Sequence, residues 1–331
     1  MTLDKVAKYA GVSTATVSRV LNNAESVRTA TRKRVLEAVR ELKYYPNIHA
    51  KALAGARSRT IGMIVSNLKN PYFLDIFGSL EAIADRSGYE VVVESTGYST
   101  ERLVSSVHSM LGRSLLGLSV IVSEMDDSLI EELTQSALPV VFHDVGRATP
   151  NAIHITADWQ RPIQKTVEYL HSLGHRKMAF IGHNESLASL HARRTAFLTT
   201  MDTYSKDVEF ATEADVDGPE GGRQATRRLL ASGFRPTAIL CVNDFMALGV
   251  LRELNERRIR VPEEISVTGF DNINLSEFTN PPLTTVNIPR ERIGRLVFEA
   301  LVPQSGHAAM NREIVVHADL VIRDSTGAAM A

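Results

Sequence analysis

Most of the chain alternates short apolar runs with longer amphipathic segments, and this pattern limits the folds open to it. Eight runs have the character of buried strands: Ile61–Val65, Glu90–Glu94, Leu118–Ile121, Val140–His143, Ile153–Ile155, Lys177–Ile181, Ala238–Cys241 and Ser266–Phe270. Eight helices are predicted around them: Phe73–Ser87, Thr100–Gly112, Asp127–Ser136, Gln160–Leu173, Ala192–Met201, Gly221–Ala231, Asp244–Arg257 and Arg290–Leu301. Such alternation indicates doubly wound parallel sheets with helices on both faces. About 270 residues exceed one open sheet of this kind, so we expect an α/β core of two lobes.

Composition excludes several other classes of protein. A single Cys among 331 residues excludes a disulfide framework and a thiolate-dominated zinc site. No run approaches about 18 apolar residues, so no membrane span is expected. The first residues, Met1 to Lys5, lack the apolar core of a secretory signal, and a cytoplasmic location is therefore expected.

The charge is divided unevenly along the chain. The first 60 residues contain twelve Lys and Arg against four acids, a net +8, whereas the other 25 basic and 34 acidic residues sum to −9. The total of −1 is therefore a cancellation. A basic head on an acidic body favours a phosphate-binding module, and the alternative is an ordinary solvated helical surface.

The basic head has the pattern of an all-α helix-turn-helix unit. Thr2 can cap a helix to Ala10, Gly11 can form the turn, and Ser13 can cap a second helix to about Asn22. Thr31 begins a third helix. Its apolar residues Val35, Leu36, Val39 and Leu42 have the i, i+1, i+4, i+7 spacing of one helix face, which predicts that they face the core.

In such a unit the start of the second helix reads base edges in the major groove. Thr14, Ala15 and Arg19 have side chains suited to base contacts, Arg to guanine in particular. Ser13, Thr16 and Ser18 suit phosphates, and Asn22 closes the predicted DNA-contacting set. We expect Val17, Val20 and Leu21 to be core instead.

The run from Leu3 to Asn22, LDKVAKYAGVSTATVSRVLN, closely resembles the N-terminal signature of the LacI/GalR repressor family, and matches to the family's pattern continue to Arg323. The resemblance implies a core of two periplasmic-binding-protein-like lobes behind the helix-turn-helix head. The implied limits are 1–45 for the head, 46–59 for a hinge helix and linker, 60–157 plus 288–316 for one lobe, and 158–287 plus 317–327 for the other.

The hinge segment is informative by itself. Asn47 can cap, and Gly55 can end, a helix of about seven residues, which is too short to be stable alone in water. The resemblance implies that two such helices pair in the minor groove and that Leu53 is wedged between base pairs. The alternative is a linker helix whose Leu53 packs on the body.

Polar and aromatic side chains follow several of the predicted strands, where doubly wound sheets bind ligands. They are Asn67, Asn70, Tyr72, Phe73, Asp144, Arg193, Arg194, Asn243, Asp244 and Asp271. Each could equally be a cap or turn residue, and Asp244 in particular is expected to be a cap.

The resemblance selects effector-binding residues from this set. Phe73, Asn243 and Asp271 match the family's pattern directly. Arg193 matches an effector arginine, although Ala196 replaces a glycine of that motif. Asp144 matches an effector-contacting carboxylate, although Val145 stands where many members have arginine.

One departure from the family pattern concerns ligand chemistry. Asp217 stands where sugar-binding members often stack an aromatic ring on the ligand. Trp159, the only Trp, either lines the cleft in its place or packs in the core. We expect a small polar effector, sugar-like by resemblance.

Enzymatic motifs are absent from the sequence: it contains no Gly-x-Ser-x-Gly, phosphate-binding loop or dinucleotide fingerprint. His171 and His175 are four apart, but Gly174 separates them from one helix face, so no metal or cofactor is expected. The alternatives are a sugar-metabolising enzyme with an accessory helical domain and a solute-binding protein.

The interpretation that joins these features is a ligand-controlled transcription factor. Homodimers would bind pseudo-palindromic operator DNA with one head per half-site. A small-molecule effector between the lobes would change their closure and thereby the pairing of the hinges. The tail after Arg323 has no heptad run, so dimers rather than tetramers are expected.

Overall fold

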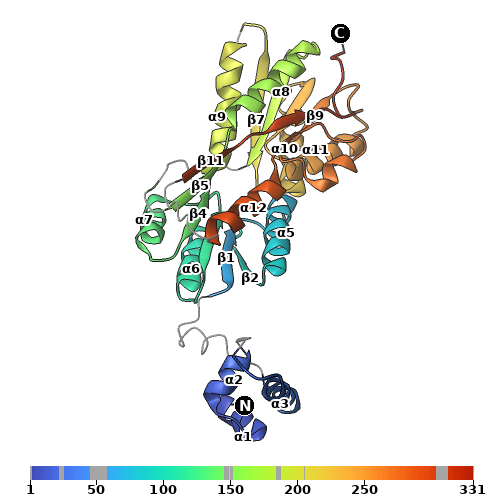
Figure 1. Cartoon of the computed structure of the whole chain (residues 1–331). Helices are drawn as coiled ribbons and strands as arrows, with labels where there is room; N and C mark the ends of the chain where they lie inside the picture. Colours follow the sequence, from blue (N-terminus) through green and yellow to red (C-terminus); the bar gives the residue numbers. More distant parts are fainter. Residues whose placement is uncertain are drawn as a thin grey trace. The chain divides into compact units, whose positions relative to one another are not determined.

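The protein is described from a computed structural model that places residues 2–21, 26–44, 58–144, 149, 152–183, 188–204, 206–302 and 312–330. The chain divides into two compact units, Met1–Ser58 and Arg59–Ala331 (Figure 1). Each unit is described by itself below.

The first unit is a three-helix bundle, formed by α1 (Leu3–Ala10), α2 (Thr14–Leu21) and α3 (Thr29–Glu41). Its small core consists of seven buried apolar residues: Val6, Ala7, Ala10, Val17, Val20, Val35 and Ala38. Gly11 ends α1 in the left-handed conformation, with φ of 63°, which glycine adopts without strain. The predicted helix-turn-helix is therefore confirmed.

The caps and one core position differ from the prediction. The Ser13 hydroxyl accepts the Thr16 amide at 3.2 Å and caps α2 as expected, whereas the Thr2 side chain makes no capping bond to α1. Helix α3 begins at Thr29 rather than Thr31. Leu36 is 45% exposed, because Val35 and Ala38 are the residues of α3 that face α1 and α2.

The second unit contains a six-stranded sheet in the order β11-β5-β4-β3-β1-β2, and every neighbouring pair is parallel. Its strands are β1 (Thr60–Val65), β2 (Glu90–Ser95), β3 (Gly117–Ile121), β4 (Val140–His143), β5 (Ala152–Ala157) and β11 (Arg312–Val316). Its helices are α5 (Pro71–Arg86), α6 (Thr100–Leu111), α7 (Asp127–Gln135) and α12 (Arg290–Leu301).

Alternate side chains of the strands enter two different cores, as the two-residue period of a strand requires. In β1, Ile61 and Met63 join the cluster that contains α5 and α12, whereas Ile64 joins the cluster that contains α6 and α7. Helices thus cover both faces of this sheet. The ends of the strands are the part of the sheet that the helices leave uncovered.

A second parallel sheet has the order β7-β6-β8-β9. Its strands are β6 (Lys177–His183), β7 (Glu209–Asp215), β8 (Ala238–Cys241) and β9 (Ser266–Thr268). Its helices are α8 (Gln160–Ser172), α9 (Ala188–Thr203), α10 (Pro219–Ala231) and α11 (Asp244–Glu256). An antiparallel pair, β10 (Thr285–Asn287) with β12 (Asp319–Val321), and the short helix η1 (Asn274–Glu277) complete this unit.

The two parallel-sheet lobes and the helical head confirm the predicted fold class. The sequence did not reveal β7, β10 or β11, because these strands are short or carry charged residues along an edge. The predicted residue limits of the lobes stay a prediction.

Helices α10 and α11 approach closely through glycine. A Cβ atom on Gly249 would lie 1.8 Å from the Pro219 carbonyl oxygen, and one on Gly222 would lie 2.1 Å from that of Met246. The glycine in the sequence NDFMALG is therefore explained by backbone contact.

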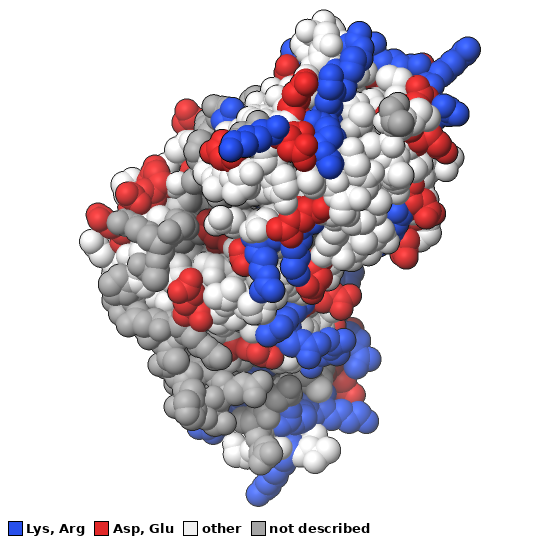
Figure 2. Space-filling model, turned by 90° about the horizontal axis from the view of Figure 1, so that it is seen from above, with Lys and Arg blue, Asp and Glu red and all other residues white. Residues whose placement is uncertain are grey.

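On the face shown in Figure 2, basic and acidic side chains are interspersed rather than separated by sign. Within the described part of the chain, no helix has the length and apolar character to cross a membrane.

Candidate functional site

Helix α2 of the first unit exposes the predicted DNA-reading side chains. Ala15 and Arg19 are exposed, and Thr14 is partly exposed, whereas Val17 and Val20 are buried as expected. Of the residues assigned to phosphates, Ser13 is exposed, Thr16 and Ser18 are partly exposed, and the Ser13 and Thr16 hydroxyls lie 2.9 Å apart. Asn22 and Leu53 lie outside the described residues.

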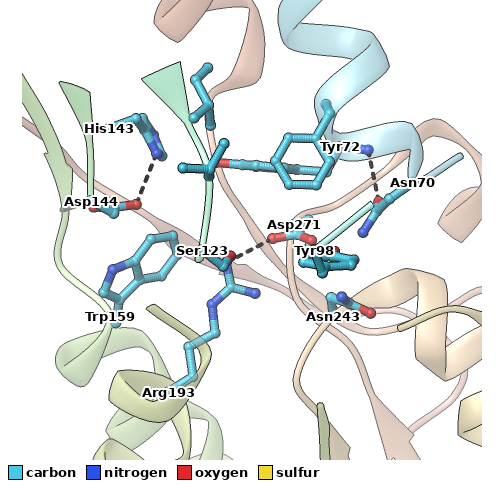
Figure 3. Close-up of a pocket in the computed structure, with 13 residues that line it drawn as sticks. Asn70, Tyr72, Tyr98, Ser123, His143, Asp144, Trp159, Arg193, Asn243 and Asp271 are labelled. Atoms are coloured by element: carbon cyan, nitrogen blue, oxygen red, sulfur yellow. Dashed lines mark hydrogen bonds and ion pairs between the residues drawn. The ribbon is translucent and has the colours of Figure 1, made fainter. Parts of the chain in front are cut away.

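The second unit holds a cavity whose empty volume of about 460 Å³ includes space open to solvent. All six predicted effector residues line it: Phe73, Asp144, Trp159, Arg193, Asn243 and Asp271. The sequence analysis missed other lining residues, namely Tyr98, Ser123 and His143. Each of these lies at or within three residues of the carboxyl end of a parallel strand, which is the signal that could have found them. Figure 3 shows the side chains converging from both lobes.

Arg193, on α9, is the buried cation of this cavity and is only 7% exposed. Its Nη1 donates to the Val242 carbonyl at 2.7 Å, and its Nη2 lies 3.4 Å from Asp271 Oδ1. The guanidinium packs on two neighbouring rings, 4.2 Å from the centroid of Trp159 and 4.6 Å from that of Phe270, whose centroids lie 5.6 Å from each other. Cleft lining and core packing were the two alternatives for Trp159, and the structure shows both, because Trp159 lines the cavity and also packs on Arg193.

Asp271 is buried against Arg193, with an unusual backbone φ of 100°. Its amide donates to the Val286 carbonyl, and its own carbonyl accepts a bond from Arg290. Burial raises the pKa of the Asp271 carboxyl to about 7, although Arg193 and Arg290 both act to lower it. This carboxyl therefore titrates near neutral pH.

His143 and Asp144 form a second buried pair, with Nδ1 and Oδ2 3.1 Å apart. Asp144 Oδ1 also accepts the Ala157 amide at 2.8 Å. Burial raises the pKa of Asp144 and lowers the pKa of His143, so both environments favour the uncharged form.

Four buried polar atoms around the cavity have no hydrogen-bond partner within the described part of the chain. They are Tyr72 Oη, His143 Nε2, Arg193 Nε and Asp271 Oδ1, of which Asp271 Oδ1 is in ion-pair contact with Arg193 Nη2. Buried polar groups are normally paired, so orphans that line one cavity indicate a place for a polar ligand or water. The cavity walls also include the rings of Phe73 and Trp159, which offer apolar contact.

Asn243 has both of the roles open to it, whereas the role of Asp244 differs from the prediction. Asn243 is the N-cap of α11, since its Oδ1 accepts the Met246 amide at 2.8 Å, and it also lines the cavity. Asp244 is a fully buried structural carboxylate and not the expected cap; it accepts the Ile273 amide at 2.8 Å and the Thr285 hydroxyl.

The two histidines of the α8 region do not share a site. His171 lies 2.6 Å from Asp207, whereas His175 contacts the Thr237 hydroxyl and the Gly327 carbonyl, each at 3.0 Å. Among the described residues, no group of three or more His, Cys, Asp or Glu could hold a metal ion.

Comparison with known proteins places this architecture in a family. Residues 2–47 match the family of bacterial regulatory proteins, lacI family, and residues 167–326 match a periplasmic binding protein-like domain. The chain is 33% identical to an HTH-type transcriptional repressor PurR of Mannheimia succiniciproducens, over 98% of both chains. The chain belongs to the lacI family of bacterial regulatory proteins.

Other lacI-family members extend the comparison. A PurR repressor of Vibrio vulnificus is 33% identical over 98% of both chains. The Lac repressor dimer bound to operator and the anti-inducer ONPF has a TM-score of 0.84 at 33% identity and covers 99% of both chains. The CelR–cellobiose complex has a TM-score of 0.72 at 26% identity, covering 98% of this chain and 99% of that one. The protein is a DNA-binding transcriptional repressor of this family and not an enzyme, so the sugar-metabolising alternative is set aside.

Proposed function

We propose that this lacI-family repressor binds pseudo-palindromic operator DNA as a homodimer and that a small polar effector in the cavity controls its affinity for the operator. The observation that supports effector control is a set of three buried polar atoms without a hydrogen-bond partner among the described residues, Tyr72 Oη, His143 Nε2 and Arg193 Nε, in a cavity lined from both lobes. In this proposal, 1–45 is the head and 46–59 the hinge. One lobe is 60–157 plus 288–316, and the other is 158–287 plus 317–327. Its place of action is the cytoplasm, where operator DNA lies.

Operator reading is assigned to helix α2. Thr14, Ala15 and Arg19 would contact base edges, and Ser13, Thr16, Ser18 and Asn22 would contact the backbone. Support comes from the exposure of Ala15 and Arg19 on a helix whose opposite face is buried. Leu53 would add a minor-groove wedge, so Leu53→Ala would reduce DNA bending without unfolding the core.

Arg19→Ala tests base reading. An operator is first selected from random duplexes, and binding to all single-base variants is measured by fluorescence anisotropy. We expect discrimination at one base pair to fall by about 1–3 kcal/mol. The control, Lys33→Ala, removes an exposed charge from α3 and should weaken all duplexes alike. An equal loss on every duplex for Arg19→Ala would make Arg19 a phosphate contact only.

The chemistry of the cavity favours an uncharged effector. Two lining carboxyls, Asp144 and Asp271, accompany one lining cation, Arg193, whose charge is already engaged by Asp271. A phosphate or carboxylate would have to compete for Arg193 with the Asp271 carboxyl, which is partly ionised at neutral pH, and would find no second Lys or Arg among the described lining residues. The orphaned Tyr72, His143 and Arg193 atoms suit hydroxyl groups or ring nitrogens, and the aromatic walls suit a ring. The relatives named PurR favour a purine-type ring over the sugar that the resemblance implied.

A thermal-shift screen with matched pairs tests this effector class. Purine bases and nucleosides are compared with nucleotides, and mono- and disaccharides with sugar phosphates. We expect an uncharged compound to raise the melting temperature and to change operator affinity, and its phosphorylated partner to do neither. Tighter binding of the phosphorylated partner would contradict the proposed charge preference.

The homodimer rests on exposed apolar side chains as well as on the Lac repressor dimer. Leu275 of η1 is 49% exposed, and the next aromatic along the chain, Phe278, is 83% exposed. Large apolar side chains with this exposure favour burial against a second subunit.

A further inference from the structure

The carboxylate of Asp217 joins the two lobes at the edge of the cavity. Asp217 lies between β7 and α10, in the lobe of the four-stranded sheet. Its oxygens accept four hydrogen bonds: from Asn67 Nδ2 at 3.1 Å, Asn70 Nδ2 at 3.2 Å, Tyr98 Oη at 2.8 Å and Asn243 Nδ2 at 2.9 Å. Three of these donors lie in the other lobe, between β1 and α5 or between β2 and α6.

Each asparagine in this group is oriented by its own loop. The Oδ1 atoms of Asn67, Asn70 and Asn243 accept the backbone amides of residues two or three positions further on, at 3.0, 3.0 and 2.8 Å. With the oxygen engaged in this way, the NH2 group of each side chain is directed outward. The donors therefore face Asp217 before the lobes meet, and little side-chain entropy is lost when they bind it.

Asp217 does not itself line the cavity, but three of its partners do: Asn70, Tyr98 and Asn243. Figure 3 shows Tyr98 and Asn243 close together on the cavity wall, from different lobes. Asp217, at the position where other family members stack a ring on the ligand, therefore contacts the residues of the cavity wall and does not line the cavity itself.

We propose that Asp217 is a positioning residue that holds the cleft closed without a bound effector and sets the places of Asn70, Tyr98 and Asn243 on its wall. Charge-assisted hydrogen bonds are the strong class of hydrogen bond, and this carboxylate receives three of them across the cleft. The inference goes beyond effector binding, because it concerns the closed state of the protein alone and can be tested whether or not any effector is found.

Trp159 provides a direct reporter of closure, since it is the only tryptophan of the chain and lines the cleft. The three crossing bonds are accepted by Oδ2 of Asp217, and Oδ1 accepts the bond from Asn243. In Asp217→Asn, one uncharged oxygen must serve either the crossing donors or Asn243, so the crossing bonds are lost or lose their charge assistance while the side chain keeps its size. We expect the closed-to-open ratio to fall by roughly tenfold or more. The constant for acrylamide quenching of Trp159 fluorescence should rise in the effector-free full-length protein.

Two further variants separate closure from folding. Asp215→Asn, two residues earlier, removes a carboxylate bound by Arg228 within the same lobe at 2.7 Å and should leave quenching unchanged. Adding Asn70→Asp to Asp217→Asn returns an acceptor to the opposite lobe and keeps the α5 cap, so quenching should return part of the way to the wild-type value.

The result that overturns the inference is wild-type quenching in Asp217→Asn with an unchanged circular dichroism spectrum. If that variant does not fold, Tyr98→Phe decides, because it removes one crossing bond and keeps the ring contact with His183 at 4.8 Å. Tyr98→Phe should then raise the quenching constant by a smaller amount, and no rise would equally reject the role of Asp217.

Discussion

The strongest test of the electrostatics of the cavity is Asp271→Asn, which we expect to stabilise the core while removing the response to effector. Asparagine has the shape of a protonated aspartic acid and tolerates a positive φ, so the fold around residue 271 is kept. The buried carboxyl has a pKa of about 7, against 3.8 for an ordinary aspartic acid. Ionising it in the folded protein is therefore costly, despite the contact with Arg193.

The pH dependence follows from this raised pKa. Below about pH 4 the carboxyl is protonated in both the folded and the unfolded chain, and the substitution should have little effect. Between about pH 4 and pH 7 the unfolded chain ionises first, and the wild-type protein loses stability relative to the variant. The difference of about three pKa units corresponds to about 4 kcal/mol, which is an upper value for the gain at about pH 8.

Urea unfolding, followed by Trp159 fluorescence at several pH values between about 4 and 8, measures this gain. The wild-type free energy of unfolding should fall relative to that of Asp271→Asn as the pH rises. The control is Asp202→Asn, which removes an exposed carboxylate from α9 and should follow the wild type. An Asp271→Asn protein that is no more stable than the wild type at about pH 8 would refute the argument from burial.

Other substitutions test separate parts of the structure. Glu253 is 97% buried within its side chain; burial raises its pKa, but bonds from Arg227 and Arg257 lower it to about 2. The ionised Glu253 stabilises the folded protein above about pH 4.5, and this stabilisation is lost toward pH 2. Glu253→Gln should therefore lower the free energy of unfolding in urea by up to about 3 kcal/mol at neutral pH and by much less at about pH 2.5. A loss of stability that does not depend on pH would contradict the ion-pair explanation. Gly249→Ala should cost about 2 kcal/mol or more, seen as a lower melting temperature, because its Cβ would overlap the α10 backbone; an unchanged melting temperature would show that the helices separate freely. Phe278→Asp should weaken the homodimer at least roughly tenfold in analytical ultracentrifugation with an unchanged circular dichroism spectrum, and an unaltered dimer would place the interface elsewhere.

Local pattern was sufficient for most of the elements. The eight predicted strands and eight predicted helices each correspond to an observed element, with ends that differ by a few residues. Strand β7 was missed because EFATEAD has little apolar alternation on the edge of its sheet. Leu36 was wrongly placed in the core, since spacing alone did not show which side of α3 faces the bundle.

The sequence by itself determined the basic helix-turn-helix head, the alternating core and the residue types at the strand ends, because each depends on neighbours a few positions apart. Only the tertiary structure decided which of those residues meet. Asn67 and Asp217 are 150 positions apart, and Arg193 is 78 residues from Asp271, yet both pairs are in contact. Such contacts depend on how the chain crosses between two sheets, and burial at the meeting point then sets the protonation of Asp271. The chemistry of the cleft is therefore a property of the folded protein rather than of any segment of its sequence.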